Sequence, residues 1–305
     1  MLRSFFITLS KSTALRSFAM KNALAQRAAR RFVSGLTLDE AFPAIRELNS
    51  KGIQVTMDFL GESVTTQPEA LAAADEAIRI LEFIASRDIR GNVSVKLTQL
   101  GLELGQEFCR DNVARIAAKA QALGNFLRID MEDTPATDRT LEIFHAMLER
   151  VGPAHVGIVL QSYLYRTEGD AAEVMKRGGR IRLCKGAYKE PAAVAFPRKT
   201  DVNANFVKVM KMMLDSGLYH GIATHDEAMI RATKAYAEEK KIDRRKFEFQ
   251  MLYGIRRDLQ EQLVGDGWNV RVYVPYGDQW YPYYMRRMAE RPANVLFILK
   301  NLFRK

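Results

Sequence analysis

The sequence predicts an α/β protein built as a closed (β/α)8 TIM-type barrel. From residue 52 onward, short β-rich runs alternate with longer helical stretches, which is typical of a parallel sheet covered by helices. Eight such units span roughly 250 residues, the usual size of this barrel. No Gly-x-Gly-x-x-Gly follows an early strand, so an open dinucleotide-binding sheet is disfavoured. We expect a barrel over residues 51–305, preceded by a helical arm over residues 1–50 that packs on it.

The strands are expected where β-branched and aromatic runs stand between turn residues. We place them at residues 54–59, 92–97, 126–131, 156–161, 181–185, 221–224, 247–252 and 270–274. The helices between them carry apolar residues at helical spacing or are rich in helix-forming residues. We place these at residues 68–87, 106–123, 138–151, 170–176, 202–216, 227–240 and 255–264. Turn residues follow at 275–278, and Pro282 suits the first turn of a last helix that Pro292 ends.

The net charge of +10 is concentrated at the N-terminus, where residues 1–38 contain seven Lys or Arg and no acidic residue. Apolar residues recur there at helical spacing, which favours two or three short helices packed on the barrel. A mitochondrial transit peptide is the alternative. A basic arm could also bind nucleic acid or lipid, so a binding protein is the non-enzymatic rival. It lacks the interleaved aromatic residues of a surface that reads bases, and we expect no nucleic-acid partner.

Two further features bear on the compartment. Cys109 and Cys184 lie far apart and have no metal-ligating neighbours, which argues against a disulfide framework or a zinc site and favours a reducing compartment. No apolar run approaches the eighteen or so residues that a membrane-spanning helix needs. We therefore expect a cytoplasmic protein, at most peripheral at the inner face of the membrane.

Each predicted strand ends in polar side chains, and barrel enzymes place their sites at these strand ends. The residues are Asp58 with Glu62, Lys96, Asp130 with Glu132 and Asp133, Gln161, Arg182 with Lys185, Thr224 with His225, Gln250, and Tyr273. A single one of them would more often be a helix cap or part of a buried ion pair, but together they indicate a site.

The composition of this set limits the chemistry. His225 is the only histidine near a strand end, and His145, His155 and His220 are expected at surface or helix positions, so a hydrolytic triad is disfavoured. The acidic residues after the third strand could hold a hard cation or serve Lys96 and Arg182, and we expect no metal. Several cations and donors together suit a polyanionic, ring-containing cofactor and a carboxylate substrate.

Gly186 follows Lys185 at a strand end, where the backbone must come close to something bulky. A pyrophosphate or a flavin ring would fit there. The same Lys-Gly pair is also typical of a Schiff-base aldolase, with Lys96 or Lys185 as the nucleophile, and this is the rival enzyme.

The last predicted helix carries Arg286, Arg287 and Glu290 on one face, with Tyr283 one turn earlier. Two adjacent guanidinium groups beside a carboxylate make a planar grip for a small carboxylate. The alternative is a solvated charged face with an internal ion pair.

Seven stretches of the chain, taken in order, form a recognisable pattern. They are residues 94–102, 130–133, 159–166, 182–188, 223–226, 247–254 and 273–292, and the fourth reads Arg-Leu-Cys-Lys-Gly-Ala-Tyr. Together they resemble proline dehydrogenase, the FAD-dependent barrel enzyme, in its bacterial monofunctional form. The resemblance implies oxidation of L-proline to Δ1-pyrroline-5-carboxylate by hydride transfer from Cδ to N5 of FAD, the first step of proline catabolism to glutamate.

The resemblance also implies the residues of the substrate pocket. Arg286 and Arg287 would grip the proline carboxylate with support from Lys96, and Tyr273 would pack on the pyrrolidine ring. Asp130, Leu252 and Glu290 would line the same pocket. Glu62 would pair with Arg286 as a gate when the site closes. Lys96, Tyr273 and Arg182 are the expected catalytic residues.

For the cofactor, the resemblance places Arg182 at flavin N5 and Gln161 at the pyrimidine edge. The remaining contacts to the flavin, its ribityl chain and its phosphates would come from Lys185, Gly186, Ala187, Tyr188, Thr224 and His225. Lys189 and Asp226 depart from the pattern of the longer bifunctional relatives, so the adenine end is less defined. A membrane quinone is the expected electron acceptor. The chain ends too early for a second catalytic domain, so a separate pyrroline-5-carboxylate dehydrogenase is expected.

Overall fold

Eight parallel strands form the centre of the molecule. The computed structural model describes residues 15, 19, 22, 29–61 and 63–290, and of residues 286–290 the backbone alone. Within this part the strands close into a barrel in sequence order, with β1 beside β8. They are β1 (Gln54–Phe59), β2 (Gly91–Val95), β3 (Leu127–Ile129), β4 (Val156–Gln161), β5 (Arg180–Cys184), β6 (His220–Ala223), β7 (Phe247–Leu252) and β8 (Val270–Tyr276).

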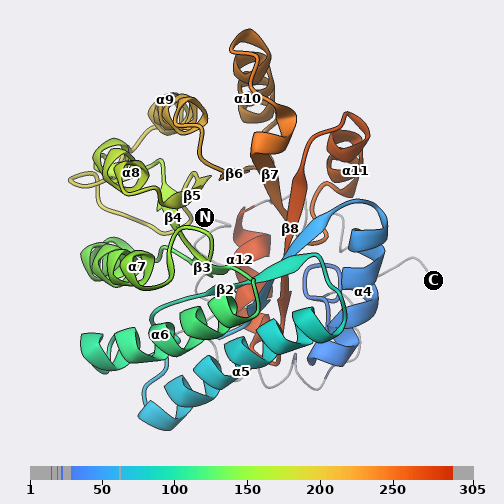
Figure 1. The fold of residues 1–305 in the computed structure, drawn as a ribbon, viewed down its shortest axis with the longest axis vertical. Helices are drawn as coiled ribbons and strands as arrows, with labels where there is room; N and C mark the ends of the chain where they lie inside the picture. Colours follow the sequence, from blue (N-terminus) through green and yellow to red (C-terminus); the bar gives the residue numbers. More distant parts are fainter. Residues whose placement is uncertain (1–14, 16–18, 20–21, 23–28, 62, 291–305) are drawn as a thin grey trace.

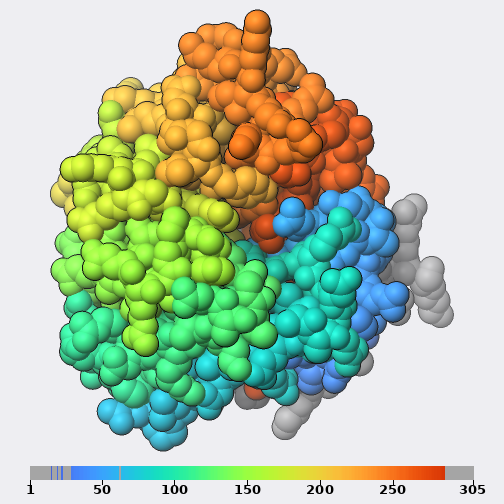
Figure 2. All heavy atoms as spheres, viewed as in Figure 1, coloured from blue at the N-terminus to red at the C-terminus, as the bar shows by residue number. Residues whose placement is uncertain are grey.

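Helices surround this barrel (Figure 1). The surrounding helices are α4 (Leu38–Ser50), α5 (Gln67–Ser86), α6 (Gln106–Ala122), α7 (Thr137–Val151), α8 (Thr167–Lys176), α9 (Lys199–Asp215), α10 (Glu227–Glu239) and α11 (Arg257–Gly265), with short 3-10 turns at Thr134–Ala136 and Arg244–Lys246. A further helix, α12 (Trp280–Glu290), follows β8. In the space-filling view the chain colours follow one another around the molecule, since each β/α unit lies beside the next (Figure 2).

Local sequence explains where several helices begin. Thr66 and Glu69 form a reciprocal capping box at the start of α5. The Asp226 carboxylate accepts a hydrogen bond from the Ala228 backbone N–H at the start of α10. The predicted closed barrel is confirmed, and β1, β4 and β7 have the predicted bounds.

The predicted turn at residues 275–278 is wrong in its first half, because β8 continues to Tyr276. Pro275 has no N–H to give, but its carbonyl accepts from the Ser34 backbone N–H at 2.9 Å. The Tyr276 carbonyl accepts from Leu60 N–H at 2.8 Å. Proline is tolerated near a strand end when only its carbonyl is required, and here the N-terminal segment supplies a donor.

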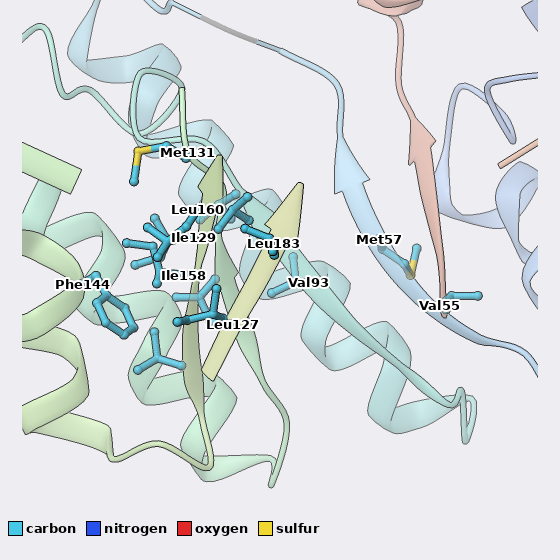
Figure 3. Packing of buried hydrophobic residues seen from close by; sticks show 14 of the residues in the cluster. Val55, Met57, Val93, Leu127, Ile129, Met131, Phe144, Ile158, Leu160 and Leu183 are labelled. Carbon is cyan, nitrogen blue, oxygen red and sulfur yellow. The ribbon is translucent and has the colours of Figure 1, made fainter. Parts of the chain in front are cut away.

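The hydrophobic core lies between the barrel and its outer helices. Figure 3 shows Leu127, Ile129 and Ile158 of two neighbouring strands directed towards Phe144 of α7. All four side chains are at most 1% exposed. Because strand residues alternate between two faces, the residues between these apolar ones must point into the barrel.

Helix α12 packs against the N-terminal segment that precedes α4. Trp280 and Tyr283 belong to one buried cluster with Phe32 and Val33. In projection α12 lies inside the ring of helices (Figure 1). The expected two or three short helices of residues 1–38 fall largely outside the described residues. Among the helices that the structure describes, none has an apolar stretch long enough to cross a bilayer.

Candidate functional site

The barrel interior is polar, whereas branched aliphatic side chains usually fill it. Side chains of strands that are not neighbours in the sheet meet there, so they must lie inside the barrel. Buried polar residues on or directly after the strands include Thr56, Asp58, Asn92, Ser94, Arg128, Asp130, Gln161, Arg182, Glu248 and Gln250. Burying so many polar groups is costly unless each is paired, which indicates a site rather than a core.

Arg182 of β5 lies at the centre of this interior and is 6% exposed. Its Nη1 donates to Asp130 Oδ1 at 2.8 Å and to Ser94 Oγ at 3.4 Å. Its Nε donates to Gln250 Oε1. The guanidinium also lies 5.3 Å from the ring centroid of Tyr273 in β8. Residues from four other strands or strand ends therefore converge on one cation.

Lys96, Tyr273 and two carboxylates extend this group towards β1. Lys96 Nζ lies 3.2 Å from Asp58 Oδ1 and 3.3 Å from the Tyr273 hydroxyl. The Tyr273 hydroxyl donates to Asp130 Oδ2 at 2.8 Å. Burial, with the nearby carboxylates, raises the pKa of Tyr273 well above its usual value, so the phenol stays neutral and donates.

Asp58 is a buried carboxyl group of the site with a shifted pKa. Burial is the largest influence and raises the pKa of Asp58 to about 6, although the Lys96 charge acts in the opposite direction. Lys96 and Arg182 carry two positive charges, and Asp58 and Asp130 carry two negative ones when ionised. These four groups are thus neutral together above about pH 6, and any excess of positive charge must come from elsewhere.

The acidic residues after β3 do not converge on one point. Glu132 accepts from the backbone N–H and the hydroxyl of Thr98, at 3.0 and 2.5 Å. Asp133 is exposed, whereas Asp130 faces Arg182. Over residues 29–61 and 63–285 no group of three or more His, Cys, Asp or Glu side chains is arranged to hold a metal ion.

Gln161, at the end of β4, has one atom without a protein partner. Its Nε2 donates to the carbonyls of Met131 and Glu132, both at 3.2 Å. Its Oε1 is buried and accepts no hydrogen bond from the protein. A buried acceptor of this kind usually has a donor, and a bound ligand can supply one.

A second group of residues lies at the rim, after β5 and β6. Lys185 Nζ lies 2.7 Å from Asp226 Oδ2 and 2.6 Å from Asn203 Oδ1. Thr224 Oγ1 accepts from Asp226 N–H at 3.0 Å. His225 Nε2 accepts from the Leu252 backbone N–H at 2.9 Å, so the ring nitrogen at that position carries no proton.

The loop after β5 comes close to Tyr163. Gly186 has a φ of +110°, and a Cβ on it would lie 2.6 Å from the Tyr163 ring. Ala187 is exposed and Tyr188 half-buried on the same loop. Gly186 is therefore required both by its backbone conformation and by the space available.

Four predicted site residues cannot be placed. Glu62 lies outside the described residues, and so do the side chains of Arg286, Arg287 and Glu290, although their backbone belongs to α12. Their carboxylate grip and the Glu62–Arg286 gate stay predictions. Of the other predicted residues, the structure brings Lys96, Asp130, Arg182 and Tyr273 together in the interior, and Lys185, Thr224 and His225 at the rim.

A buried ion pair near Arg182 is not among the residues predicted from the sequence. Glu248 Oε1 accepts from Arg271 Nε at 2.6 Å, and both side chains are nearly buried. Neither residue lies at a strand end, but both follow the alternation of polar residues along β7 and β8, and this alternation is the sequence signal for the pair.

The expected surface or helix position of His220 is wrong. His220 is the first residue of β6 and is fully buried. Its Nδ1 accepts from Ile181 N–H at 3.0 Å, and its Nε2 lies 3.0 Å from Ser216 Oγ. Burial, together with Arg128 and Arg180, lowers the pKa of His220 to about 3. The predicted strand began one residue too late, which left the histidine outside it.

Comparison with known proteins gives consistent results. The sequence model of the family described as "Proline dehydrogenase" matches residues 41–300. "Proline dehydrogenase 2" of Bacillus subtilis is 43% identical over 303 residues, 99% of each chain. "Proline dehydrogenase" of Deinococcus radiodurans is 43% identical over 279 residues, 90% of each chain.

Among solved structures, the chain resembles proline utilization A (PutA) from Bdellovibrio bacteriovorus inactivated by N-propargylglycine. The TM-score is 0.82 at 25% identity, and the match covers 87% of this chain and 33% of that one. The chain thus corresponds to about a third of that larger protein. These three relatives are bacterial, so they lend no support to a mitochondrial location, and they do not bear on contact with a membrane.

Proposed function

The chain belongs to the proline dehydrogenase family, the oxidoreductases that carry out the first step of proline catabolism, and we propose that it oxidises L-proline to Δ1-pyrroline-5-carboxylate with FAD. The family match and the full-length identity to bacterial monofunctional relatives support the reaction. The cofactor and the roles of individual residues are supported by the site itself.

The observation that favours a flavin most is the buried Oε1 of Gln161, which has no donor from the protein. The pyrimidine ring of a flavin carries an N–H group that matches such an acceptor. At the rim, Lys185, which lies 2.7 Å from Asp226, could offer its cation to a phosphate. The residues present therefore fit the cofactor.

FAD, when bound, supplies the hydride acceptor for Cδ of proline. Arg182 would then stabilise the negative charge that develops beside it, because its guanidinium is already held by Asp130 and Gln250 and needs no rearrangement. Gln161, Lys185, Gly186, Ala187, Tyr188, Thr224 and His225 would hold the cofactor.

For the substrate, we assign the carboxylate to Arg286, Arg287 and Lys96. Tyr273 would present its ring to the pyrrolidine, and its hydroxyl bond to Asp130 fixes the ring orientation. Leu252, Asp130 and Glu290 would complete the pocket, and Glu62 would close it by pairing with Arg286.

The substrate amine must be neutral when hydride leaves. Nearby cations lower the pKa of an amine, so an excess of positive charge would favour the reactive form without a dedicated base. Because the four described charges around Lys96 balance above about pH 6, this excess depends on Arg286 and Arg287.

The Schiff-base aldolase alternative is weakened by the partners of both candidate lysines. A nucleophilic lysine must lose its proton, and a carboxylate neighbour opposes that loss. Lys185 lies 2.7 Å from Asp226, and Lys96 lies 3.2 Å from Asp58.

The same proposal includes a membrane quinone as electron acceptor and a separate pyrroline-5-carboxylate dehydrogenase. It also includes a cytoplasmic or membrane-peripheral location, and the division of the chain into an arm (residues 1–50) and a barrel (residues 51–305). Residues 1–14 of the basic arm lie outside the described residues, so binding of nucleic acid by it is not proposed.

The visible absorption spectrum of the purified protein tests the proposal. We expect flavin bands near 450 nm, roughly where oxidised flavins absorb, and their bleaching by L-proline without oxygen. D-proline is the matched control and should leave the bands unchanged. A colourless protein that borohydride traps covalently with a carbonyl substrate would instead support the aldolase.

A further inference from the structure

Every nitrogen of the Arg182 guanidinium faces an acceptor inside the barrel. Nη1 faces Asp130 Oδ1 at 2.8 Å, and Nη2 lies 3.5 Å from Thr56 Oγ1. Nε donates to Gln250 Oε1. Gln250 is thus the acceptor that fixes the inner end of the guanidinium, the end next to the flexible side-chain stem.

The Gln250 amide has only one orientation that satisfies both of its ends. Arginine can only donate, so Oε1 must face Arg182. Nε2 then donates to Glu248 Oε1 at 2.5 Å. Glu248 is held in turn by Arg271 Nε at 2.6 Å and by the Tyr219 hydroxyl at 2.9 Å. Burial alone would raise the pKa of Glu248, but Arg271 and these hydrogen bonds outweigh it and lower the pKa, so the carboxylate is an acceptor.

The neighbouring strand leaves room for this amide. Gly221 of β6 lies opposite Glu248 in the sheet register. A Cβ on Gly221 would lie 2.7 Å from Gln250 Cδ, closer than such atoms approach each other. Gly221 has no positive φ, so the space for Gln250 is what requires a glycine here.

We propose that Gln250 is a positioning residue for Arg182, that Glu248 holds the Gln250 amide, and that Gly221 leaves the space this amide needs. Glu248, Gln250 and Arg182 form a chain of hydrogen bonds inside the barrel. Glu248 and Gln250 are two residues apart on β7, so both side chains point into the barrel. Only the consequence of this chain for the cofactor rests on the proposed function.

The first test measures Arg182 itself. In protein labelled with 15N-arginine, the Nε–H resonance of Arg182 is identified by its loss in Arg182→Lys. We expect this proton to exchange slowly with water in the wild type. In Gln250→Leu, which keeps the volume but removes the acceptor, exchange should be about tenfold faster, since one hydrogen bond is lost. An unchanged resonance in Gln250→Leu would overturn the proposal.

The second test uses the holoenzyme. In Gln250→Leu, Arg182 is held less firmly, so we expect kcat to fall about tenfold with little change in KM for proline. The reason is that Arg182 stabilises the negative charge that develops on the flavin during hydride transfer, rather than the bound substrate. The reduction potential of the flavin should become more negative. Gly221→Ala should shift both quantities in the same direction without changing any polar group. Equal potentials in wild type and both variants would contradict the proposal.

A paired exchange separates positioning from simple destabilisation. Gln250→Glu alone places a second carboxylate beside that of Glu248, and the repulsion between them should lower the stability of the protein. In Glu248→Gln with Gln250→Glu, residue 250 again accepts from Arg182 and residue 248 again donates to residue 250. We expect the double variant to recover the Arg182 resonance and the potential relative to Gln250→Glu. Failure to recover either would count against the chain of contacts.

Thr233→Val is the matched control for stability. It removes a buried hydroxyl bond to the Met229 carbonyl on the outer helix α10, away from the barrel interior. We expect it to lower the melting temperature while leaving the potential unchanged. If the protein carries no flavin, the proposed function fails, but the Arg182 resonance still tests the role of Gln250.

Discussion

Lys96 Nζ lies 3.2 Å from Oδ1 of Asp58, so the lysine assigned to the substrate carboxylate is already paired with a carboxylate of the barrel. Asp58 is 1% exposed, and burial raises its pKa to about 6. The charge that Lys96 can offer to a substrate therefore depends on pH, because protonation of Asp58 removes its competitor.

Asp58 should make the protein less stable as the pH rises. Its pKa is higher in the folded state, about 6, than the ordinary 3.8, so its contribution is fully present below pH 3.8 and is lost as the pH rises through about 6. The loss is on the order of 3 kcal/mol. Urea unfolding of wild type and Asp58→Asn at several pH values measures it. The difference between the two free energies should change between about pH 4 and 7; parallel profiles would exclude the buried titration.

His220 should act in the opposite direction. Its pKa is about 3 in the folded protein and ordinarily 6.5, so its contribution is present above pH 6.5 and is lost as the pH falls towards 3. The same unfolding series compares the wild type with His220→Gln, whose amide oxygen can still accept from Ile181 N–H but does not titrate. Relative to this variant, the wild type should lose on the order of 5 kcal/mol as the pH falls from 6.5 towards 3. Because the two groups oppose each other, the wild type alone should vary less between about pH 4 and 6 than either variant. A steeper wild-type profile would contradict this.

Gly186→Ala should weaken binding of the cofactor. The φ of +110° and the Tyr163 ring 2.6 Å from the added Cβ both oppose the substitution. We expect a loss of about 1–3 kcal/mol in unfolding free energy and a lower ratio of flavin to protein absorbance. Gly169→Ala is the matched control, since Gly169 belongs to α8 and nothing lies within 4 Å of a Cβ added there. It should stabilise by about 0.5–1 kcal/mol. Equal flavin content in both variants would argue against close packing of the Gly186 loop on the cofactor.

Arg182→Met should keep the flavin but change its reduction potential. The substitution removes the cation 2.8 Å from Asp130 and leaves the Tyr273 hydroxyl as a donor to that carboxylate. With the positive charge gone, the potential should become more negative. Equilibration with a redox dye measures the potential. A potential equal to that of the wild type would contradict the placement of Arg182 beside the flavin.

Arg286→Met and Arg287→Met should each lower kcat/KM for proline with the flavin still bound. Each lost charge-assisted contact is expected to cost about 1.5–3 kcal/mol, or roughly 10- to 150-fold. Steady-state kinetics with proline and the visible spectrum measure both effects. Wild-type kinetics in both variants would overturn the assignment of the carboxylate grip.

The closed barrel and the approximate positions of its strands follow from the amino-acid sequence alone. The predicted bounds 54–59, 156–161 and 247–252 are the observed ones, because apolar and β-branched residues predominate in each of these segments. Arg182 and Asp130 were named because polar residues at strand ends stand out in such runs. Period-two alternation sets which face a side chain takes, and this can be seen in any one strand.

Which of these side chains meet depends on the tertiary structure. Arg182 contacts Gln250 two strands away, and Glu248 contacts Arg271 below them. The stagger of the whole barrel sets the height of each residue, and it depends on all eight strands together. Burial of His220 likewise depends on the residues packed around it. Cross-barrel partners and the pKa values that follow from them are therefore properties of the closed barrel, since no single strand contains the information.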